Sequence, residues 1–186
     1  MSQNIADFYT SVQANDFARQ FQFRVLQLAN ITFDDSSLVY IETANLPGRS
    51  INNIQVPFMG LNFNVPGTAS YPGSEGWGVT FRCDQNYNIR AALENATIAT
   101  FDDSSSTGSY NIATPASNII LALLGKDGSF VRQYTLFGAY VVSLDALTYN
   151  LADNGTIVTQ PATLAYQYWR VTGGTNPITG FSGLQA

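Results

Sequence analysis

Residues 54–65 read IQVPFMGLNFNV and give the clearest local signal of β structure in the chain. Apolar residues occupy every second position on both sides of Met59-Gly60: Ile54, Val56, Phe58, Leu61, Phe63 and Val65. Such alternation places successive side chains on opposite faces of a β-strand, and a tight Met-Gly turn between two such runs predicts a β-hairpin. Pro57 has no N–H to donate to a strand ladder, so we expect an edge position or a bulge there.

Alternation outside this hairpin predicts that strands dominate the whole chain. Phe21, Phe23 and Val25 share one face of the first predicted strand. The run at 118–124 is apolar on both faces, which is typical of a strand that is covered on both sides. The further predicted strands cover residues 20–28, 38–46, 79–84, 118–124, 129–137, 138–143 and 156–171.

The segments between these strands predict one packed helix and several loops. Ile89, Ala92, Leu93 and Ala96 recur at helical spacing, which predicts a helix from about Asn86 to about Ala99, capped by Asp84 or Asn86. Polar or glycine-rich composition predicts turns or loops at 30–37, 67–76 and 102–117, and residues 4–16 predict a short helical or irregular arm.

These elements favour a mainly β fold, an antiparallel barrel or sandwich with one packed α-helix. The chain has 186 residues, enough for one ordinary domain with its own core. We expect that domain, with its N-terminal arm, over residues 1–171. Residues 172–186 predict a flexible glycine-rich tail, or one that docks on a neighbour.

The composition argues against most enzymatic chemistry. The chain has no histidine, which removes the commonest general base and the commonest metal ligand. Its single cysteine, Cys83, forms neither an internal disulfide nor a cysteine metal cluster. We therefore expect no catalytic site, no metal site and no cofactor.

The chain has few charged residues, and its net charge is negative. Charged residues make up 11% of the chain, against roughly 25% in a typical soluble domain. This scarcity suggests that partners cover much of the surface. The net charge of −5 disfavours a nucleic-acid binder, which would carry a basic face. Residues 1–7 lack the features of a secretory signal, and no apolar run approaches the ~20 residues of a membrane span, so we expect synthesis and folding in a cytoplasm.

Two alternative functions from other classes remain open at this point. Tyr166, Tyr168 and Trp169 would suit a β-sandwich that stacks glycans, although their alternation favours core and subunit contacts. A carboxylate hydrolase would need two acids in one cleft, and no local motif predicts such a pair.

Several segments, in order, resemble the inner tail tube protein of contractile-tailed bacteriophages, and more distantly the tube protein of type VI secretion systems. Together they span roughly residues 15–170, and the longer 102–117 loop and the 172–186 tail depart from the pattern. The matching segments are Asn15-Asp16-Phe17-Ala18-Arg19, Leu46-Pro47, Ile54-Gln55-Val56-Pro57-Phe58-Met59, Asn64-Val65-Pro66-Gly67, Trp77–Arg82 with the helix after it, Phe137-Gly138-Ala139-Tyr140, and Leu164-Ala165-Tyr166-Gln167-Tyr168-Trp169.

The resemblance implies a structural subunit of the viral tail, assembled in the host cytoplasm. Homohexameric rings would stack into a tube, and DNA would pass through the lumen during ejection without specific binding. The implied partners are further copies of the chain, the tail sheath protein, the baseplate tube initiator and the tail terminator. A baseplate-proximal or terminator relative of the tube protein is the alternative within this resemblance.

Two surfaces are candidates for contacts within such a tube. The helix, through Arg90 and Glu94, is our candidate for the side that faces the sheath. The segment that leads into the hairpin is our candidate for contact with the next ring: Leu46, Pro47, Gly48, Arg49, Ser50, Ile51, Asn52 and Asn53.

Overall fold

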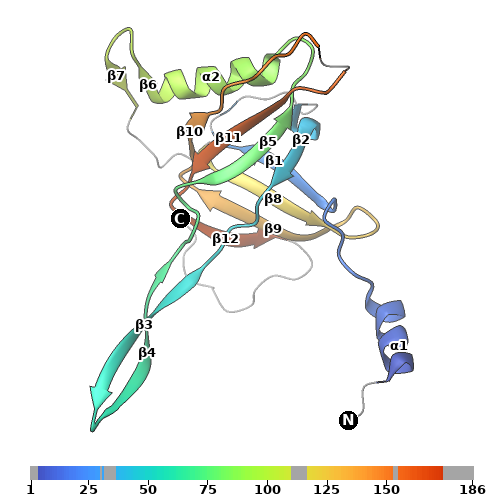
Figure 1. Cartoon of the computed structure of the whole chain (residues 1–186), viewed down its shortest axis with the longest axis vertical. Helices are drawn as coiled ribbons and strands as arrows, with labels where there is room; N and C mark the ends of the chain where they lie inside the picture. Colours follow the sequence, from blue (N-terminus) through green and yellow to red (C-terminus); the bar gives the residue numbers. More distant parts are fainter. Residues whose placement is uncertain (1–3, 30, 32–36, 110–116, 153–154, 174–186) are drawn as a thin grey trace.

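The computed structural model describes residues 4–29, 31, 37–109, 117–152 and 155–173. Most of the predicted turn at 30–37, the second half of the predicted loop at 102–117, and the predicted tail from residue 174 onward lie outside the described residues. The described chain forms two four-stranded antiparallel sheets, two helices and two separate hairpins (Figure 1).

The first sheet has the strand order β1-β8-β9-β12. The predicted turn Lys126-Asp127-Gly128 joins its two central strands. Asp127 stabilises this turn because its carboxylate accepts from the backbone N–H and the hydroxyl of Ser129. The strands of this sheet are β1 (Phe23–Leu28), β8 (Ile119–Leu124), β9 (Phe130–Phe137) and β12 (Tyr168–Gly173).

The second sheet has the strand order β10-β11-β5-β2. A short 3-10 helix, η1 (Ser37–Tyr40), precedes its edge strand β2, so the predicted strand at 38–46 is shorter than expected. The strands of this sheet are β10 (Tyr140–Leu144), β11 (Thr159–Ala165), β5 (Trp77–Arg82) and β2 (Ile41–Ala44).

One hydrophobic core joins the two sheets with helix α2 (Asn88–Thr100). Because side chains alternate along β5, Trp77, Val79 and Phe81 all face this core. Ile89 and Leu93, one helical turn apart, insert from α2 into the same cluster. The fold is thus a mainly β sandwich with one packed helix, as the sequence predicts, and in the described residues neither sheet closes into a barrel.

Two arms leave this body (Figure 1). One is helix α1 (Ile5–Asn15), and the other is the hairpin of β3 (Ser50–Phe58) and β4 (Leu61–Ser70). The predicted hairpin and its turn are confirmed, because Met59 and Gly60 both have positive φ (48° and 80°) between paired strands. A smaller hairpin, β6 (Phe101–Asp102) with β7 (Thr107–Gly108), follows α2 inside the predicted loop.

The structure corrects three further expectations. Phe21 lies outside β1 and is 78% exposed, so it does not share the buried face of Val25. The predicted loop at 67–76 begins later, because β4 continues to Ser70, whose hydroxyl bonds that of Ser50 at 2.7 Å. The predicted strand at 156–171 is two strands in different sheets.

The predicted strand at 156–171 is divided by the residues between β11 and β12. The backbone N–H of Tyr166 donates to the Ser74 carbonyl at 2.8 Å, and that of Gln167 donates to the Phe137 carbonyl at 2.9 Å. These bonds carry the chain from the second sheet to the first. Local alternation alone carries no sign of the change.

Candidate functional site

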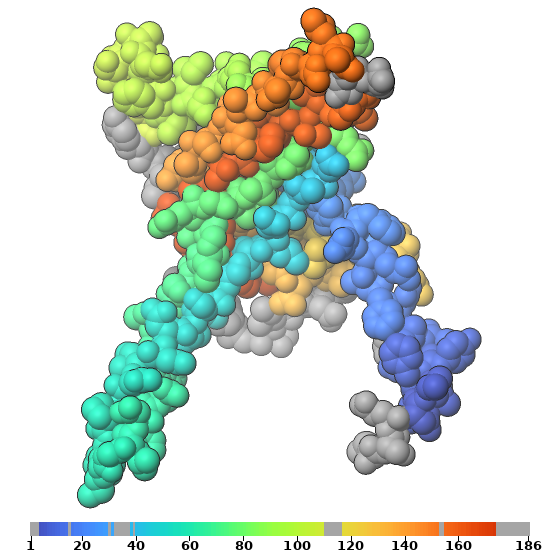
Figure 2. All heavy atoms as spheres, in the orientation of Figure 1, coloured from blue at the N-terminus to red at the C-terminus, as the bar shows by residue number. Residues whose placement is uncertain are grey.

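The hairpin arm is held at its root by the two tryptophans. The indole N–H of Trp77 donates to the Asn45 carbonyl at 2.6 Å, and that of Trp169 donates to the Gly48 carbonyl at 2.8 Å. Trp77 is 3% exposed in the core, and Trp169 packs edge-on against Tyr71 and Tyr134. The arm therefore begins from a fixed point on the body, although most of its length projects beyond it (Figure 2).

The predicted inter-ring segment, Leu46–Asn53, is the base of this arm. Leu46 and Ile51 are about half exposed, at 53% and 47%. The structure thus brings the segment together with the hairpin that follows, as one continuous projection. Its contact with a next ring stays a prediction.

The rest of the hairpin has one apolar face and one amide face. Cross-strand pairs place Ile54 opposite Val65 and Val56 opposite Phe63, whereas Gln55 lies opposite Asn64 on the other face. The apolar side chains are exposed between 43% (Val65) and 64% (Leu61). A two-stranded hairpin with an uncovered apolar face is marginal in water, which makes this face a candidate contact surface.

Helix α1 is the second arm. Asn4 caps its first turn, because the side-chain oxygen accepts from the backbone N–H of Asp7 at 2.9 Å. The segment from Asp16 to Gln22 joins α1 to β1, and the Leu124 backbone N–H fixes its end by donating to the Gln22 carbonyl at 3.0 Å. The Asp16–Arg19 ion pair in this segment is exposed and adds little stability.

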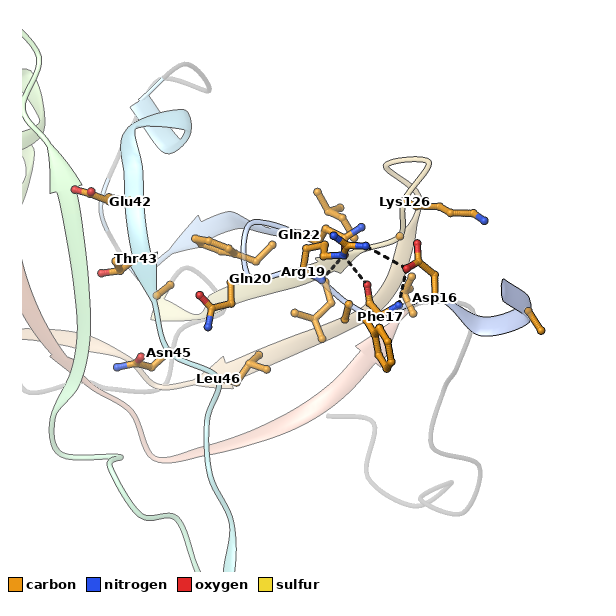
Figure 3. A pocket seen from close by; sticks show the side chains of 18 residues that line it. Asp16, Phe17, Arg19, Gln20, Gln22, Glu42, Thr43, Asn45, Leu46 and Lys126 are labelled. Carbon is orange, nitrogen blue, oxygen red and sulfur yellow. Dashed lines mark hydrogen bonds and ion pairs between the residues drawn. The ribbon is translucent and has the colours of Figure 1, made fainter. Parts of the chain in front are cut away.

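A groove of about 950 Å³ lies between this linker and the edge of the body (Figure 3). Asp16 and Arg19 line one end of it, and Thr43 and Asn45 of the β2 side line the other. The backbone N–H of Phe17 and the Arg19 guanidinium lower the pKa of Asp16 below its usual range.

Two carboxylates, those of Asp16 and Glu42, line this groove, and both are in ion pairs. Asp16 pairs with Arg19 at 3.3 Å, and Glu42 pairs with Arg82 at 3.5 Å. Each acid therefore has its own arginine as an ion-pair partner.

The sheet edges are further candidate contact surfaces. In the described residues each sheet ends in two strands that pair on one side only: β1 and β12 in the first sheet, β10 and β2 in the second. Edge strands present backbone N–H and C=O groups to any strand of matching register. Which strands lie at the edges depends on pairing between distant segments, so the sequence pattern alone does not reveal it.

The structure turns Arg90 toward the body and not toward solvent. Its guanidinium donates to the Gln160 side-chain oxygen at 2.5 Å, to the Asp145 carbonyl at 3.0 Å and to Glu94 at 2.6 Å. Arg90 therefore fastens α2 to the second sheet, and Glu94, half exposed, is the member of the pair that faces outward. The exposed side of α2 also includes Ala91, Asn95 and Ile98. Contact between this helix and a sheath stays a prediction.

The three aromatic residues considered for glycan stacking do not form one platform. Tyr166 is 3% exposed and belongs to the core. Tyr168 stacks on Phe137, with ring centroids 4.8 Å apart. Trp169 faces the hairpin root. The expected core role is thus confirmed for Tyr166.

The described residues show neither a metal cluster nor a membrane helix. No group of three or more histidine, cysteine, aspartate or glutamate residues is placed to hold a metal ion in this part of the chain. Likewise, neither described helix has the length and hydrophobicity that crossing a bilayer requires.

This chain resembles known proteins in its fold and not in its sequence. No family model matches the sequence, and no curated protein matches it. Solved structures do match. A chain of the anti-feeding prophage (AFP) baseplate has a TM-score of 0.61 at 17% identity, and the match covers 87% of this chain and 99% of that chain.

The chain has a tail-tube-like fold. Two further chains support this statement. One, from the PVC sheath-tube complex of an extracellular contractile injection system, matches with a TM-score of 0.52 at 14% identity over 92% of this chain and 99% of that one. The other, from the PVC sheath/tube terminator, matches with a TM-score of 0.56 at 13% identity over 84% and 97%. The tail-tube-like fold therefore extends over nearly the whole of each matched chain.

Proposed function

We propose that this chain is a non-catalytic structural subunit of the inner tube of a contractile tail. In this proposal hexameric rings of the chain stack into a tube whose lumen conducts DNA, inside a sheath and between a baseplate initiator and a terminator. The subunit would be assembled in the host cytoplasm and reside in the virion. The observation that carries the proposal is the uncovered apolar hairpin on a body of tail-tube-like fold.

In a monomeric protein such an arm would be unfavourable. Its apolar face would remain in water, and the unpaired edges of its sheets would favour uncontrolled association. In a ring, both features are satisfied by identical copies. A rotation that closes gives a ring, and head-to-tail repetition along the axis gives a tube.

The Leu46–Asn53 segment is our candidate for the contact between rings, and the exposed side of α2 is our candidate for the sheath contact. The hairpin root supports the first assignment. The tryptophan hydrogen bonds to Asn45 and Gly48 hold the start of this segment rigidly against the body. A rigid root reduces the entropy lost when the arm binds a neighbour.

A net charge of −5 supports a role in DNA passage. Lysine and arginine grip phosphates through the release of counterions, and a lumen rich in them would retain the DNA. We expect that replacing exposed acids by lysine, one at a time, slows DNA ejection from assembled tails wherever the replaced acid faces the lumen. Unchanged ejection kinetics across the whole scan would contradict DNA conduction.

Negative-stain microscopy of the purified full chain tests the proposal. We expect tubes built of six-fold rings, and replacement of Val56 by aspartate should abolish them by charging the apolar face. Thr10→Asp adds the same charge at an exposed position of α1, outside the hairpin; it is the matched control and should retain them. Single particles without rings at every concentration would contradict the proposal.

A cap or baseplate ring is the second candidate function. It is favoured by the match to a baseplate chain, whose TM-score of 0.61 exceeds the 0.52 of the sheath-tube match. The same micrographs separate the two functions, because a cap or baseplate subunit would form single rings that do not stack.

A further inference from the structure

Helix α1 carries an apolar stripe that nothing in the described chain covers. Ile5, Phe8, Tyr9 and Val12 lie at helical spacing on one face, whereas Asp7 and Thr10 lie on the opposite face. Ile5 is 88% exposed, and Phe8 and Tyr9 are each 64% exposed. Phe17, directly after the helix, extends the stripe by packing on Phe8, with ring centroids 6.4 Å apart.

The apolar face of the β3–β4 hairpin has matching dimensions and chemistry. The 11 residues of α1 span about 16 Å along the helix axis. The hairpin face from Ile54 to Phe58 spans about 17 Å. No charged residue occurs between Ser50 and Ser70, and the single charge of α1, Asp7, lies away from its stripe. Pairing the two faces would bury apolar surface without burying a charge.

The two faces of one molecule do not meet. The arms project toward the same side of the body but from its opposite flanks, with open space between them (Figure 2). Both roots are held: the hairpin at Gly48 by Trp169, and the α1 linker at Gln22 by Leu124. Among the described residues neither face has a partner in its own molecule, and a second copy of the chain offers the complementary face to each.

We propose that α1 of one copy packs its Ile5–Phe8–Tyr9–Val12 stripe on the apolar face of the β3–β4 hairpin of the next copy in the same ring. This inference rests on the proposed self-association and names the surfaces that join neighbours. Both arms leave the same side of the body (Figure 1), so rotation about an axis that runs toward that side would bring the helix of one copy beside the hairpin of the next. Each copy gives one helix and receives one, and such a contact repeats until the ring closes.

The geometry also assigns the two faces of the hairpin to different tasks. Once α1 covers the apolar face, the amide face of Gln55, Asn62 and Asn64 stays exposed beside it. Amide side chains suit a wetter contact, such as one between rings. The apolar contact within a ring thus forms separately from the contact between rings.

Cross-linking between mixed single-cysteine variants tests the inference. In a Cys83→Ala background, one batch carries Phe8→Cys on α1 and the other carries Val56→Cys on the hairpin. The batches are mixed, assembled and treated with a short bis-maleimide. We expect a dimer whose linked peptides, identified by mass spectrometry, join positions 8 and 56.

The matched control moves the first thiol to the polar face of the same helix. Thr10→Cys, mixed with Val56→Cys, should give little of this product. Equal yields from both mixtures would overturn the inference. A double variant with both cysteines in one chain, cross-linked at high dilution, should stay uncyclised, and a cyclised monomer would also overturn it.

A binding measurement gives an independent readout. Phe8→Ala should raise by about tenfold the concentration needed for assembly, because it removes one central aromatic anchor. Thr10→Ala should leave this concentration unchanged. Equal effects of the two substitutions would contradict the inference.

Microscopy of the same mixtures separates this inference from the proposed function. Tubes without the 8–56 product would overturn the helix-to-hairpin contact and leave the tube proposal standing. The 8–56 product without rings or tubes would support the helix-to-hairpin contact and overturn the tube proposal. Circular dichroism of each variant should match the parent chain, because positions 8, 10 and 56 lie on the arms and Cys83, although in the body, is not part of the core cluster.

Discussion

Gln160 is fully buried, at 0% exposure, and its polar atoms are all matched. Its side-chain oxygen accepts from Arg90 at 2.5 Å, and its amide nitrogen donates to the carbonyls of Asp145 at 3.1 Å and Pro161 at 2.7 Å. This one amide connects α2, the chain after β10, and β11. A buried polar group with all its partners stabilises the fold, and the loss of Gln160 would remove three hydrogen bonds from this site.

Replacement of Gln160 by alanine should lower the free energy of unfolding by about 2–3 kcal/mol, because Arg90 loses a buried acceptor and Asp145 loses a donor. Urea denaturation of the unassembled protein measures this loss. Gln55→Ala on the exposed hairpin is the control and should change stability by less than about 0.5 kcal/mol. Equal effects of the two substitutions would show that the amide is not structurally important.

Asp84 caps α2 from outside the helix. Its carboxylate accepts from the backbone N–H groups of Asn88 and Ile89 at 3.2 and 3.3 Å. Burial alone would raise the pKa of this carboxyl, but the N–H groups of Ile89 and Asn88 outweigh it and lower the pKa below the ordinary value. The contribution of Asp84 to stability is therefore complete above the unfolded-state pKa and is lost as pH falls through the lower folded-state pKa.

Asp84→Ala should cost about 1 kcal/mol near neutral pH, as loss of a helix cap does. The difference between the variant and the parent should vanish in strong acid, where the parent carboxyl is protonated too. Urea denaturation at both pH values measures it. The exposed Glu75 provides the control through Glu75→Ala, and a difference for Asp84→Ala that persists unchanged in acid would contradict the capping role.

At the scale of elements, the hairpin depends on its root. Ser50 and Ser70 close the paired strands with a hydroxyl bond at 2.7 Å, and Gly67 lets the strands approach closely, because a Cβ there would lie only 3.0 Å from the Asn52 carbonyl oxygen. Trp169 then fixes the segment that enters the arm. These contacts set the direction in which the apolar face is presented.

Trp169→Phe should loosen the arm without unfolding the body. Phenylalanine retains the packing against Tyr71 and Tyr134 but lacks the N–H that donates to Gly48. Hydrogen exchange should therefore become faster in β3 and β4, while the amides of β8 and β9 stay protected. Unchanged exchange in the hairpin would show that Trp169 does not control it.

Local sequence patterns predict some of these elements and not others. The β3–β4 hairpin is predictable because alternation and the Met59-Gly60 turn are local signals. Helix α1 is only partly so, although its stripe of Ile5, Phe8, Tyr9 and Val12 and the capping Asn4 are visible in the sequence. The change of sheet after Ala165 is not predictable, since it depends on Ser74 and Phe137, which are distant in sequence.

The two candidate surfaces differ in how much of their geometry the sequence predicts. The segment Leu46–Asn53 is marked by the strong Leu46-Pro47-Gly48 breaker, and it does lie on a projecting arm. Arg90 and Glu94 suggest a surface pair at helical spacing, yet Arg90 turns inward because its partners Asp145 and Gln160 arrive from 55 and 70 residues away. Only the three-dimensional structure brings such partners together.

At the scale of the whole molecule, two apolar arms and unpaired sheet edges leave the fold incomplete as a monomer. The body has one core that joins two sheets and α2, and it accounts for the stability of the subunit. The arms lie outside that core, so under the proposed assembly they would add to stability when a second copy meets them. Assembly and folding are therefore separable, and variants of the arms should affect assembly alone.

Sedimentation velocity over a wide range of concentrations tests this account most directly. The full chain should pass from a monomer to ring-sized and larger species as concentration rises, and Val56→Asp should hold it at the monomer with an unchanged thermal midpoint. A parent chain that sediments as a monomer at every concentration, with its apolar arms still in water, would contradict the account.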